Sequence, residues 1–322
     1  MAVRSALSPI LFLSLPLLVL AAPSAAQEPA EADTAGAGAA RADTAEGAPA
    51  FGPCPDDLST PVGAEGIAWG DTAAAAARVA GELGVTALSE APVDSLLRRG
   101  DRAAAAGHHT VAYATYAAAV AADGGYGALW RASRAATDVG QDAGDDAAAD
   151  WYERAEEYAR GAVEANPRDP EGHLELARAL GLVALDANAR ERVRMSGEIR
   201  AEARAAIEAD SSYAGGWHVL GRWHKGVMEL SGLARMFART FLGGEVLGEA
   251  SWENAERYLA RAAELEPGRI LHHLELGKVY RHNDRLEQAR QELRKAAELP
   301  PADFHDCLYR DEARQLLAEM EG

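Results

Sequence analysis

The feature that most constrains this chain is a segment near its C-terminus that repeats after 34 residues. The two copies carry the same residue types at the same spacing: Ala255, Leu259, Ala262, Leu265 and Pro267 recur as Ala289, Leu293, Ala296, Leu299 and Pro301. A period of 34 residues is the length of the tetratricopeptide repeat, a pair of antiparallel helices. Alanine lets two helices cross closely, and proline follows a helix because it cannot continue one. The period therefore predicts a solenoid of helix pairs.

The first helices of these pairs share a motif centred on glycine. Trp217–Gly221 reads W-H-V-L-G, and Leu276–Tyr280 reads L-G-K-V-Y. Glycine inside a helix costs about 1 kcal/mol relative to alanine, a cost that makes sense if the second helix packs against its bare backbone. We expect burial where the helices cross at Trp217, Leu220, Gly221, Leu276, Gly277, Ala255, Ala262, Ala289 and Ala296.

Weaker matches to the pattern extend it towards the N-terminus. They comprise Gly100, Ala112, Tyr116 and Ala119, then Ala155, Ala162 and Pro167, then Leu174, Ala177, Gly181, Ala203 and Ala206. Residues 303–321 resemble a capping helix. The fold expected is all-α, a tetratricopeptide-type right-handed solenoid of about five helix pairs plus this cap, over residues 93–322.

The first 26 residues have the organisation of a secretory signal peptide. Arg4 is the only charge before the apolar run Ile10–Ala22, and Ser24-Ala25-Ala26 supplies the small residues of a cleavage site before Gln27. The alternative is a retained membrane anchor, but the run contains Pro16 and is shorter than the roughly 20 residues that a spanning helix needs. We expect an exported protein, periplasmic or secreted, with no membrane span after cleavage.

Two further segments precede the repeats. Residues 27–62 are rich in Ala, Gly, Pro, Thr, Asp and Glu, a composition that buries too little apolar surface to fold, and we expect a disordered tether. Residues 63–92 are expected to hold a pre-repeat helix, capped by Asp71, and a loop.

An insert interrupts the fourth pair. Between its two helices, Trp217–Leu230 and Ser251–Leu265, lie residues 231–250, enough for one extra short helix. The G-R-W motif at Gly221–Trp223, the Leu230-Ser231 pair, the F-L-G-G end of the insert and the two repeats beside it resemble the regulator of microtubule dynamics family. The resemblance covers roughly residues 211–299. It implies a tetratricopeptide-like helical domain and, in eukaryotic members, microtubule association. An exported chain meets no microtubules, so only the fold is taken from it.

The sequence contains no motif typical of catalysis. It lacks a phosphate-binding loop, a nucleophile elbow and an H-E-x-x-H motif. His218 and His224 lie six residues apart, too far around one helix to chelate a metal, and the neighbours His272 and His273 point to different faces. We expect no enzyme, cofactor or metal site, although histidines assembled across helices remain an alternative. The pair His108-His109 is expected at a solvated turn.

One group of cations has the placement of a binding strip. Arg222 and Lys225 lie one turn apart on a first helix, and Lys278 and Arg281 occupy the corresponding places one pair later. First helices line the concave face of such arrays. In a chain with a net charge of −18, four stacked cations, with His218 beside them, favour an acidic or C-terminal carboxylate ligand. The alternative is solvated charge paired to nearby glutamates.

Two other features leave alternatives open. Met236, Phe237 and Phe241 in the insert form either a small satellite core or a partner surface. Cys54 and Cys307, the two cysteines of the chain, form either a disulfide bridge, as exported proteins allow, or two free thiols.

Together these features predict a non-enzymatic scaffold that holds a protein or peptide partner on its concave face, with an acidic partner favoured by the strip. Alternatives are an envelope-assembly or structural component and a helical metal-dependent hydrolase. The acidic net charge argues against general affinity for nucleic acid or anionic membrane, while leaving room for a local basic patch.

Overall fold

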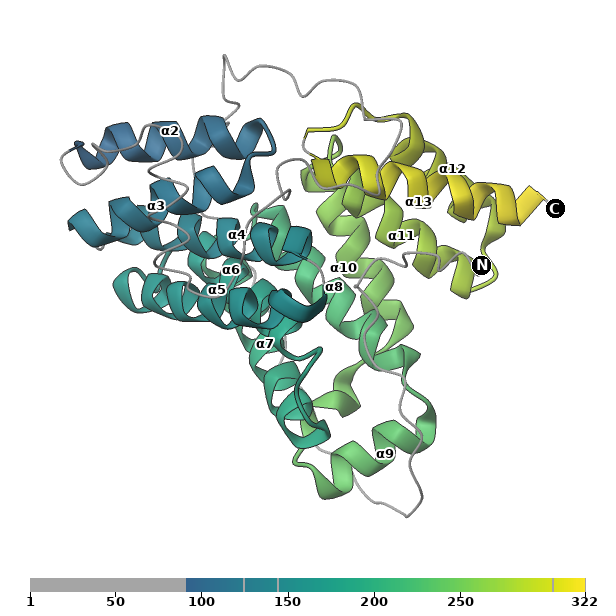
Figure 1. Ribbon diagram of the computed structural model, residues 1–322. Coiled ribbons are helices and arrows are strands. Elements are labelled where there is room, and N and C mark those ends of the chain that lie inside the picture. The colour runs from purple at the N-terminus through teal and green to yellow at the C-terminus, as the bar shows by residue number, and fades with distance from the viewer. Residues whose placement is uncertain (1–90, 124, 144, 303, 322) are drawn as a thin grey trace, which may run out of the picture.

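The computed structural model describes residues 91–321 except 124, 144 and 303, and this part of the chain is helical throughout, without a strand (Figure 1). The signal peptide, the tether, Cys54 and the helix expected from Asp71 lie outside the described residues. The helices are α2 (Val93–Ala105), α3 (His109–Asp123), α4 (Tyr126–Ala143), α5 (Asp145–Ala165), α6 (Pro170–Val183), α7 (Ala189–Ala209), α8 (Ala214–Glu229), α9 (Gly232–Phe241), η2 (Glu245–Glu249), α10 (Trp252–Leu265), α11 (Ile270–His282), α12 (Leu286–Glu298) and α13 (Phe304–Glu321).

The helices pack as five pairs followed by one last helix. The pairs are α2–α3, α4–α5, α6–α7, α8–α10 and α11–α12, and α13 packs on both helices of the last pair. Neighbouring first helices touch in the order α4, α6, α8, α11 and α13. This arrangement confirms the predicted helical solenoid.

The crossing points within pairs are close, as the glycine motif predicts. A Cβ atom added at Gly221 would lie 2.7 Å from Leu259 Cγ, and one at Gly277 would lie 2.8 Å from Leu293 Cγ. The alanines 255, 262, 289 and 296 are fully buried, and Leu220 and Leu276 are buried beside them. Trp217 was expected to be buried too, but it is only half-buried. Its indole donates to the carbonyl oxygen of Ser211 at the helix start.

Local sequence accounts for several helix ends. Asp169 caps α6 by accepting from the backbone N–H of Glu171, with Pro170 as the first helical residue. Asn188 and Glu191 form a capping box at the start of α7. Ser231 and Ser251 cap α9 and α10 by accepting from backbone N–H groups three residues later.

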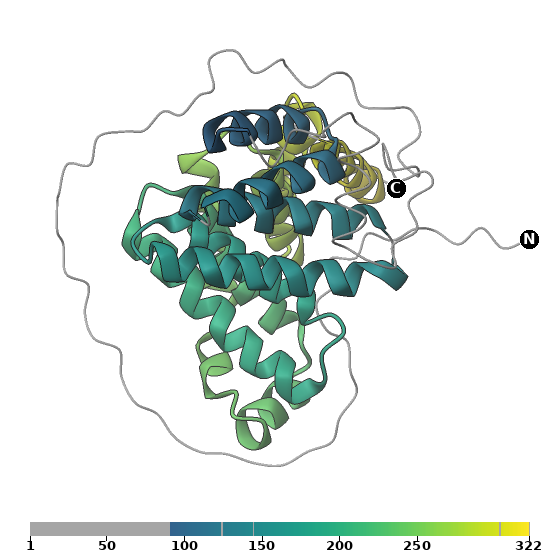
Figure 2. The same ribbon diagram turned by 60° about the vertical axis from the view of Figure 1, so that its left-hand side comes forward.

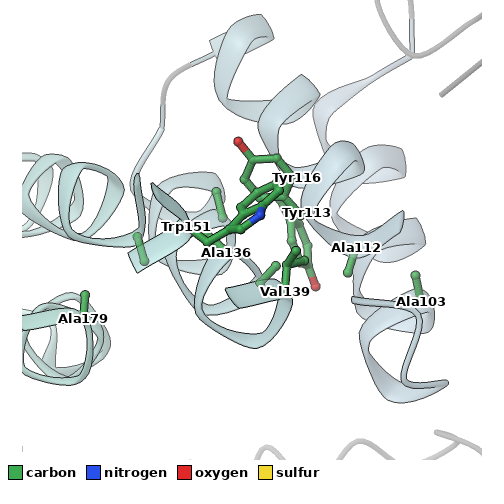
Figure 3. Packing of buried hydrophobic residues seen from close by; sticks show 11 residues of the cluster. Ala103, Ala112, Tyr113, Tyr116, Ala136, Val139, Trp151 and Ala179 are labelled. Carbon is green, nitrogen blue, oxygen red and sulfur yellow. The ribbon is translucent and has the colours of Figure 1, made fainter. Parts of the chain in front are cut away.

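Aromatic side chains fill the N-terminal core, where the pairs match the repeat pattern only weakly. Tyr113 meets Trp151 edge-to-face with ring centroids 4.8 Å apart, and Tyr116 lies beside them (Figure 3). Tyr116 takes the place that Leu259 and Leu293 hold in later pairs, because it packs against Gly100. A larger side chain thus fills the same groove and weakens the sequence signal.

The insert forms a protrusion. As expected it contains a short helix, α9, and η2 follows it. Both views place α9 at one end of the molecule, beside the start of α7 and away from α2 and α12 (Figures 1 and 2). Val193 of α7 lies against Gly244, and Val246 lies against Gly197.

The array curls until its last helix meets its early ones. His305, near the start of α13, stacks on His109 at the start of α3, with ring centroids 5.3 Å apart. His109 was expected at a solvated turn, but it is buried and its Nδ1 lies 2.7 Å from Asp142 Oδ2.

Candidate partner-binding face

One cation occupies the equivalent position on each of the helices α4, α6, α8 and α11: Arg134, Arg178, Arg222 and Lys278. These four cations and the side chains around them are called here the first-helix face. Residues 133, 221 and 277 mark the same position, because each lies against the carbonyl oxygen of an alanine on the second helix of its pair: Ala155, Ala255 and Ala289. The next residue is a cation each time. Arg178 joins the set through the repeated motif described next.

A short sequence recurs between α6 and α11 with the same contacts. Residues 173–176 and 273–276 both read H-L-E-L. The two histidines bond alike, through Nδ1 to a glutamate of the second helix and through Nε2 to a proline carbonyl before the first helix. The two buried glutamates, Glu175 and Glu275, lie three residues before the cations Arg178 and Lys278.

Ion pairs compensate the cations of the N-terminal half. Arg134 pairs with Glu171 at 3.0 Å and with Glu175 at 2.6 Å. Arg178 pairs with Asp138 at 2.5 Å. Burial disfavours the charged form of Asp138, but Arg178 outweighs it and lowers the pKa of that carboxyl to about 2. Arg134 and Arg178 could not be found from the 34-residue period, because they are separated by 44 residues.

Three of the four cations of the predicted strip also form ion pairs. Lys225 pairs with Glu229 at 2.9 Å, and Lys278 pairs with Glu312 at 2.8 Å. Arg281 pairs with Glu319 at 2.8 Å. The strip is therefore mostly charge paired to nearby glutamates, the alternative that the sequence left open. Glu312 and Glu319 come from the last helix, α13, so the array's own end supplies these partners.

Glu275 is the buried anion in the middle of this half. Its carboxylate lies 2.8 Å from Lys278 Nζ and 3.5 Å from Lys225 Nζ. Burial alone would raise its pKa, but Lys278, Lys225 and Arg222 together hold the pKa well below its ordinary value. Glu275 is therefore a fixed negative charge that neutralises the cations around it.

Arg222 differs from the other cations of the face. It is half-buried, and it forms no hydrogen bond or ion pair with any residue in the described part of the chain. Its charge acts on Glu275 and His218. Beside it, Glu275 Oε2 and His218 Nε2 are buried atoms without a hydrogen-bond partner. The equivalent oxygen Glu175 Oε2 on α6 is also a buried atom without a hydrogen-bond partner, so what distinguishes this point of the face is the guanidinium of Arg222, unpaired within the described chain.

His218, expected to line the strip, is instead part of the core between α8 and α11. Only 6% of it is exposed, and its Nδ1 lies 2.9 Å from His272 Nδ1. Burial, His272 and Arg222 hold the pKa of His218 well below its ordinary value. Counted from the crossing glycines, position 218 corresponds to Leu274, which is fully buried. That register explains why His218 faces inwards.

The insert exposes apolar side chains. Phe241 is 51% exposed, Met236 and Phe237 are half-buried, and Leu233, which the sequence analysis did not select, is 48% exposed. Phe241 therefore lies open to solvent, and the use of this surface by a partner stays a prediction. The buried residue of α9 is Ala238.

Cys307 lies on α13, where it is buried and is not a free thiol. Its predicted partner, Cys54, lies outside the described residues, so the pairing stays a prediction.

Within the described residues, no three histidine, cysteine or acidic side chains gather as metal ligands. In the same part of the chain, no helix combines the length and apolar character that crossing a bilayer requires.

Comparisons with known proteins agree with the repeat geometry. Residues 93–321 match the family model described as Regulator of microtubule dynamics protein 1-3. The sequence is 21% identical to that of TTC0263, a thermophilic TPR protein in Thermus thermophilus. The crystal structure of TTC0263 aligns with a TM-score of 0.53, over 70% of this chain and 100% of that one. MamA is 16% identical with a TM-score of 0.38, over 64% and 90% of the two chains. No curated protein matches the chain. The similarity to TTC0263 shows a tetratricopeptide fold.

Proposed function

We propose a binding function for this chain, which belongs to the family of the regulator of microtubule dynamics proteins 1-3. The protein is a non-enzymatic scaffold that holds a peptide segment of a partner protein along its first-helix face, with an acidic group of that peptide at Arg222. The expected signal peptide over residues 1–26 favours a partner outside the cytoplasm, periplasmic or extracellular, over microtubules.

The observation that carries this proposal is the contrast between Arg222 and its three equivalents. Arg134, Arg178 and Lys278 each have carboxylate partners within the described chain, whereas Arg222 has none there. A guanidinium binds a carboxylate through two parallel hydrogen bonds, which are among the stronger ones in proteins. A carboxylate supplied by a partner would complete the row of ion pairs at its centre.

A peptide suits the surroundings of Arg222 better than a simple anion. Glu275 carries a fixed negative charge beside Arg222 and repels an anion that offers no hydrogen-bond donor of its own. His218 is neutral at physiological pH because its pKa is held low. A peptide offers backbone N–H groups together with an acidic side chain or C-terminus, so it can bring donors towards Glu275 and an anion to Arg222 at once.

The test is a selection of random peptides on the immobilised chain, followed by titration of one enriched peptide. We expect the enriched peptides to share an acidic residue, and Arg222→Ala to weaken binding by at least about tenfold, equivalent to about 1.4 kcal/mol. Binding should weaken with salt, because the Debye length is about 8 Å at physiological ionic strength.

Arg281→Ala is the matched control, since Arg281 is already paired with Glu319 at the edge of the face. Equal affinities of the Arg222→Ala variant and the unmodified protein would contradict the proposal, as would a selection that enriches no peptide.

The alternative of an envelope-assembly component draws on a different observation, the exposed apolar side chains of α9.

A further inference from the structure

Helix α9 packs with its larger apolar side chains away from the protein. It rests on the body through Ala238, which is 6% exposed, while Leu233 and Phe241 are 48% and 51% exposed. Phe237 lies between them, with its ring 5.1 Å from that of Phe241. Residues four apart share one side of a helix, so these three form one apolar stripe. Burial of apolar area normally orients a surface helix the other way.

The orientation of α9 is fixed by specific contacts. Arg235 donates from its guanidinium to the carbonyl oxygen of Met228 at 3.0 Å, which ties the helix to the end of α8. Ser231 caps its first turn. Gly243, with φ of 75°, turns the chain after it, and Gly244 N donates to the carbonyl oxygen of Ala238 at 3.1 Å. The stripe therefore faces outwards because the protein holds it there.

The stripe is unusual within the molecule. Among the described residues, the exposed large apolar side chains are Leu233, Phe241 and Leu286, and α9 carries two of them. Leu286 lies on α12, at a distance from the protrusion (Figure 1).

The charge near α9 is the reverse of that of the whole chain. The helix carries Arg235 and Arg239 and no acidic residue, while the chain has a net charge of −18. The adjoining start of α7 reads A-R-E-R-V-R, with three arginines and one glutamate. Arg239 is exposed and lies over Gly248 without an ion pair to any described residue. The following η2 carries Glu245 and Glu249, so residues 189–194 and 231–250 together hold five arginines and three glutamates. The protrusion therefore combines an apolar stripe with a small excess of positive charge.

These properties distinguish between possible occupants. A second copy of the chain is disfavoured, because a helix of 10 residues offers far less than the roughly 800 Å² per partner of a stable interface. Arg239 is two residues from both Phe237 and Phe241, which puts it on the far side of α9 from the stripe, while the arginines at the start of α7 adjoin the protrusion. A short helix with Leu and Phe facing outwards and arginines at its flank suits the boundary between lipid headgroups and acyl chains. We propose that α9 docks this protein peripherally on the surface of an anionic lipid bilayer.

The shape of the molecule allows this docking despite its acidic body. Helix α7 is 21 residues long, which corresponds to about 30 Å, and its start lies beside α9 at the end of the protrusion (Figures 1 and 2). The Debye length of about 8 Å at physiological ionic strength is shorter than that. Most acidic residues of the body are then screened from the lipid, whereas Arg190, exposed at the start of α7, can reach the headgroups while Leu233, Phe237 and Phe241 enter below them.

The test is co-sedimentation with vesicles of phosphatidylcholine, with and without phosphatidylglycerol. The chain used begins at Gln27, because the apolar run at residues 10–22 would itself bind lipid. We expect binding to vesicles that contain phosphatidylglycerol and weaker binding to phosphatidylcholine alone. The double variant Leu233→Ser, Phe241→Ser should lose at least about tenfold in partitioning, because less apolar area leaves water. Arg190→Glu should weaken binding and its salt dependence.

The matched control is Leu286→Ser, which removes a similarly exposed leucine, 43% exposed, from α12. It should bind as the unmodified chain does. All variants change exposed side chains, so their melting temperatures should match. Failure of the unmodified chain to sediment with anionic vesicles would overturn the proposal, as would undiminished binding by the double variant. A dimer in the absence of vesicles that the double variant abolishes would overturn it in favour of self-association.

Discussion

At the scale of single residues, two glycines determine how closely the C-terminal pairs pack. Gly221 and Gly277 occupy the same crossing position, yet their surroundings differ. A Cβ at Gly221 would lie 3.0 Å from the backbone nitrogen of Leu259, whereas at Gly277 the two nearest atoms belong to the side chain of Leu293. A leucine side chain can shift more easily than backbone.

We therefore expect Gly221→Ala to lower the free energy of unfolding more than Gly277→Ala, and Gly277→Leu to cost about 1–3 kcal/mol through overpacking. Urea denaturation measures all three. Gly268→Ala is the control, since nothing lies within 4 Å of the added Cβ. Equal effects at positions 221, 277 and 268 would contradict the register assigned to the pairs.

The buried His224 makes stability depend on pH. Burial, followed by the charges of Arg200, Arg257 and Arg204, lowers the pKa of His224 to about 4. The unfolded chain binds the proton near pH 6.5, so the folded state loses stability as pH falls from about 6.5 to 4. His224 alone should remove about 2 kcal/mol between pH 7 and 4.5.

The measurement is the difference in unfolding free energy between these two pH values. His224→Gln should show a smaller loss than the unmodified protein, because glutamine does not titrate and can still accept from the backbone N–H of Ser251. His108→Gln, at an exposed position, should retain the full loss. Equal losses in the unmodified protein and the His224→Gln variant would show that another group causes it.

At the scale of elements, the repeated H-L-E-L motif ties two first helices, α6 and α11, to their surroundings. His173 contacts Glu202 and the carbonyl oxygen of Pro167, and both partners only accept hydrogen bonds. The imidazole therefore donates from both nitrogens, and the bond to Glu202 raises its pKa. This contribution to stability is complete below about pH 6.5 and is lost as pH rises through the folded-state pKa.

His273 makes the same two contacts, with Glu292 and Pro267. We expect His273→Ala to lower the free energy of unfolding by about 2 kcal/mol, because it removes a hydrogen bond to the charged carboxylate of Glu292, which is buried. Hydrogen exchange should accelerate in α12 and stay unchanged in the distant α3. His282→Ala, on the same helix but outside the motif, serves as the control. Exchange that accelerates equally in both helices would indicate global rather than local destabilisation.

At the scale of the whole molecule, the array closes on itself through α13. This helix supplies Glu312 and Glu319 to the cations of α11, and its His305 reaches His109 of α3. A tie at this helix would therefore act on both ends of the described array. The predicted bridge from Cys307 to Cys54 is such a tie.

We expect no free thiol in the unreduced, denatured exported protein, and a lower melting temperature after reduction. A closed loop of this length contributes up to about 5 kcal/mol in the chain-entropy model. Cys307→Ser should melt at the temperature of the reduced protein. Two free thiols per unreduced chain would contradict the pairing.

The helix pairs could be predicted from the sequence because they rest on local spacing. Ala255, Ala262, Ala289 and Ala296 repeat at 34 residues, and a helix converts such spacing directly into one buried side. The same reasoning placed the insert at residues 231–250, since the second helix resumes only at Trp252. The burial of Trp217 was overestimated, because the motif predicts the side of the helix on which it lies but not how far the neighbouring helix extends over it.

The partners of the side chains could not be predicted, because they come from distant elements. Lys278 is neutralised by Glu312 of α13, and Arg134 by residues of α6. Whether a cation is paired depends on distances of a few ångströms between helices, which the superhelical curvature sets. The lack of a partner for Arg222 among the described residues is therefore visible only in the tertiary structure. The outward stripe of α9 has the same origin: its sequence is amphipathic, but only the packing of Ala238 and Arg235 against the body decides which side faces water.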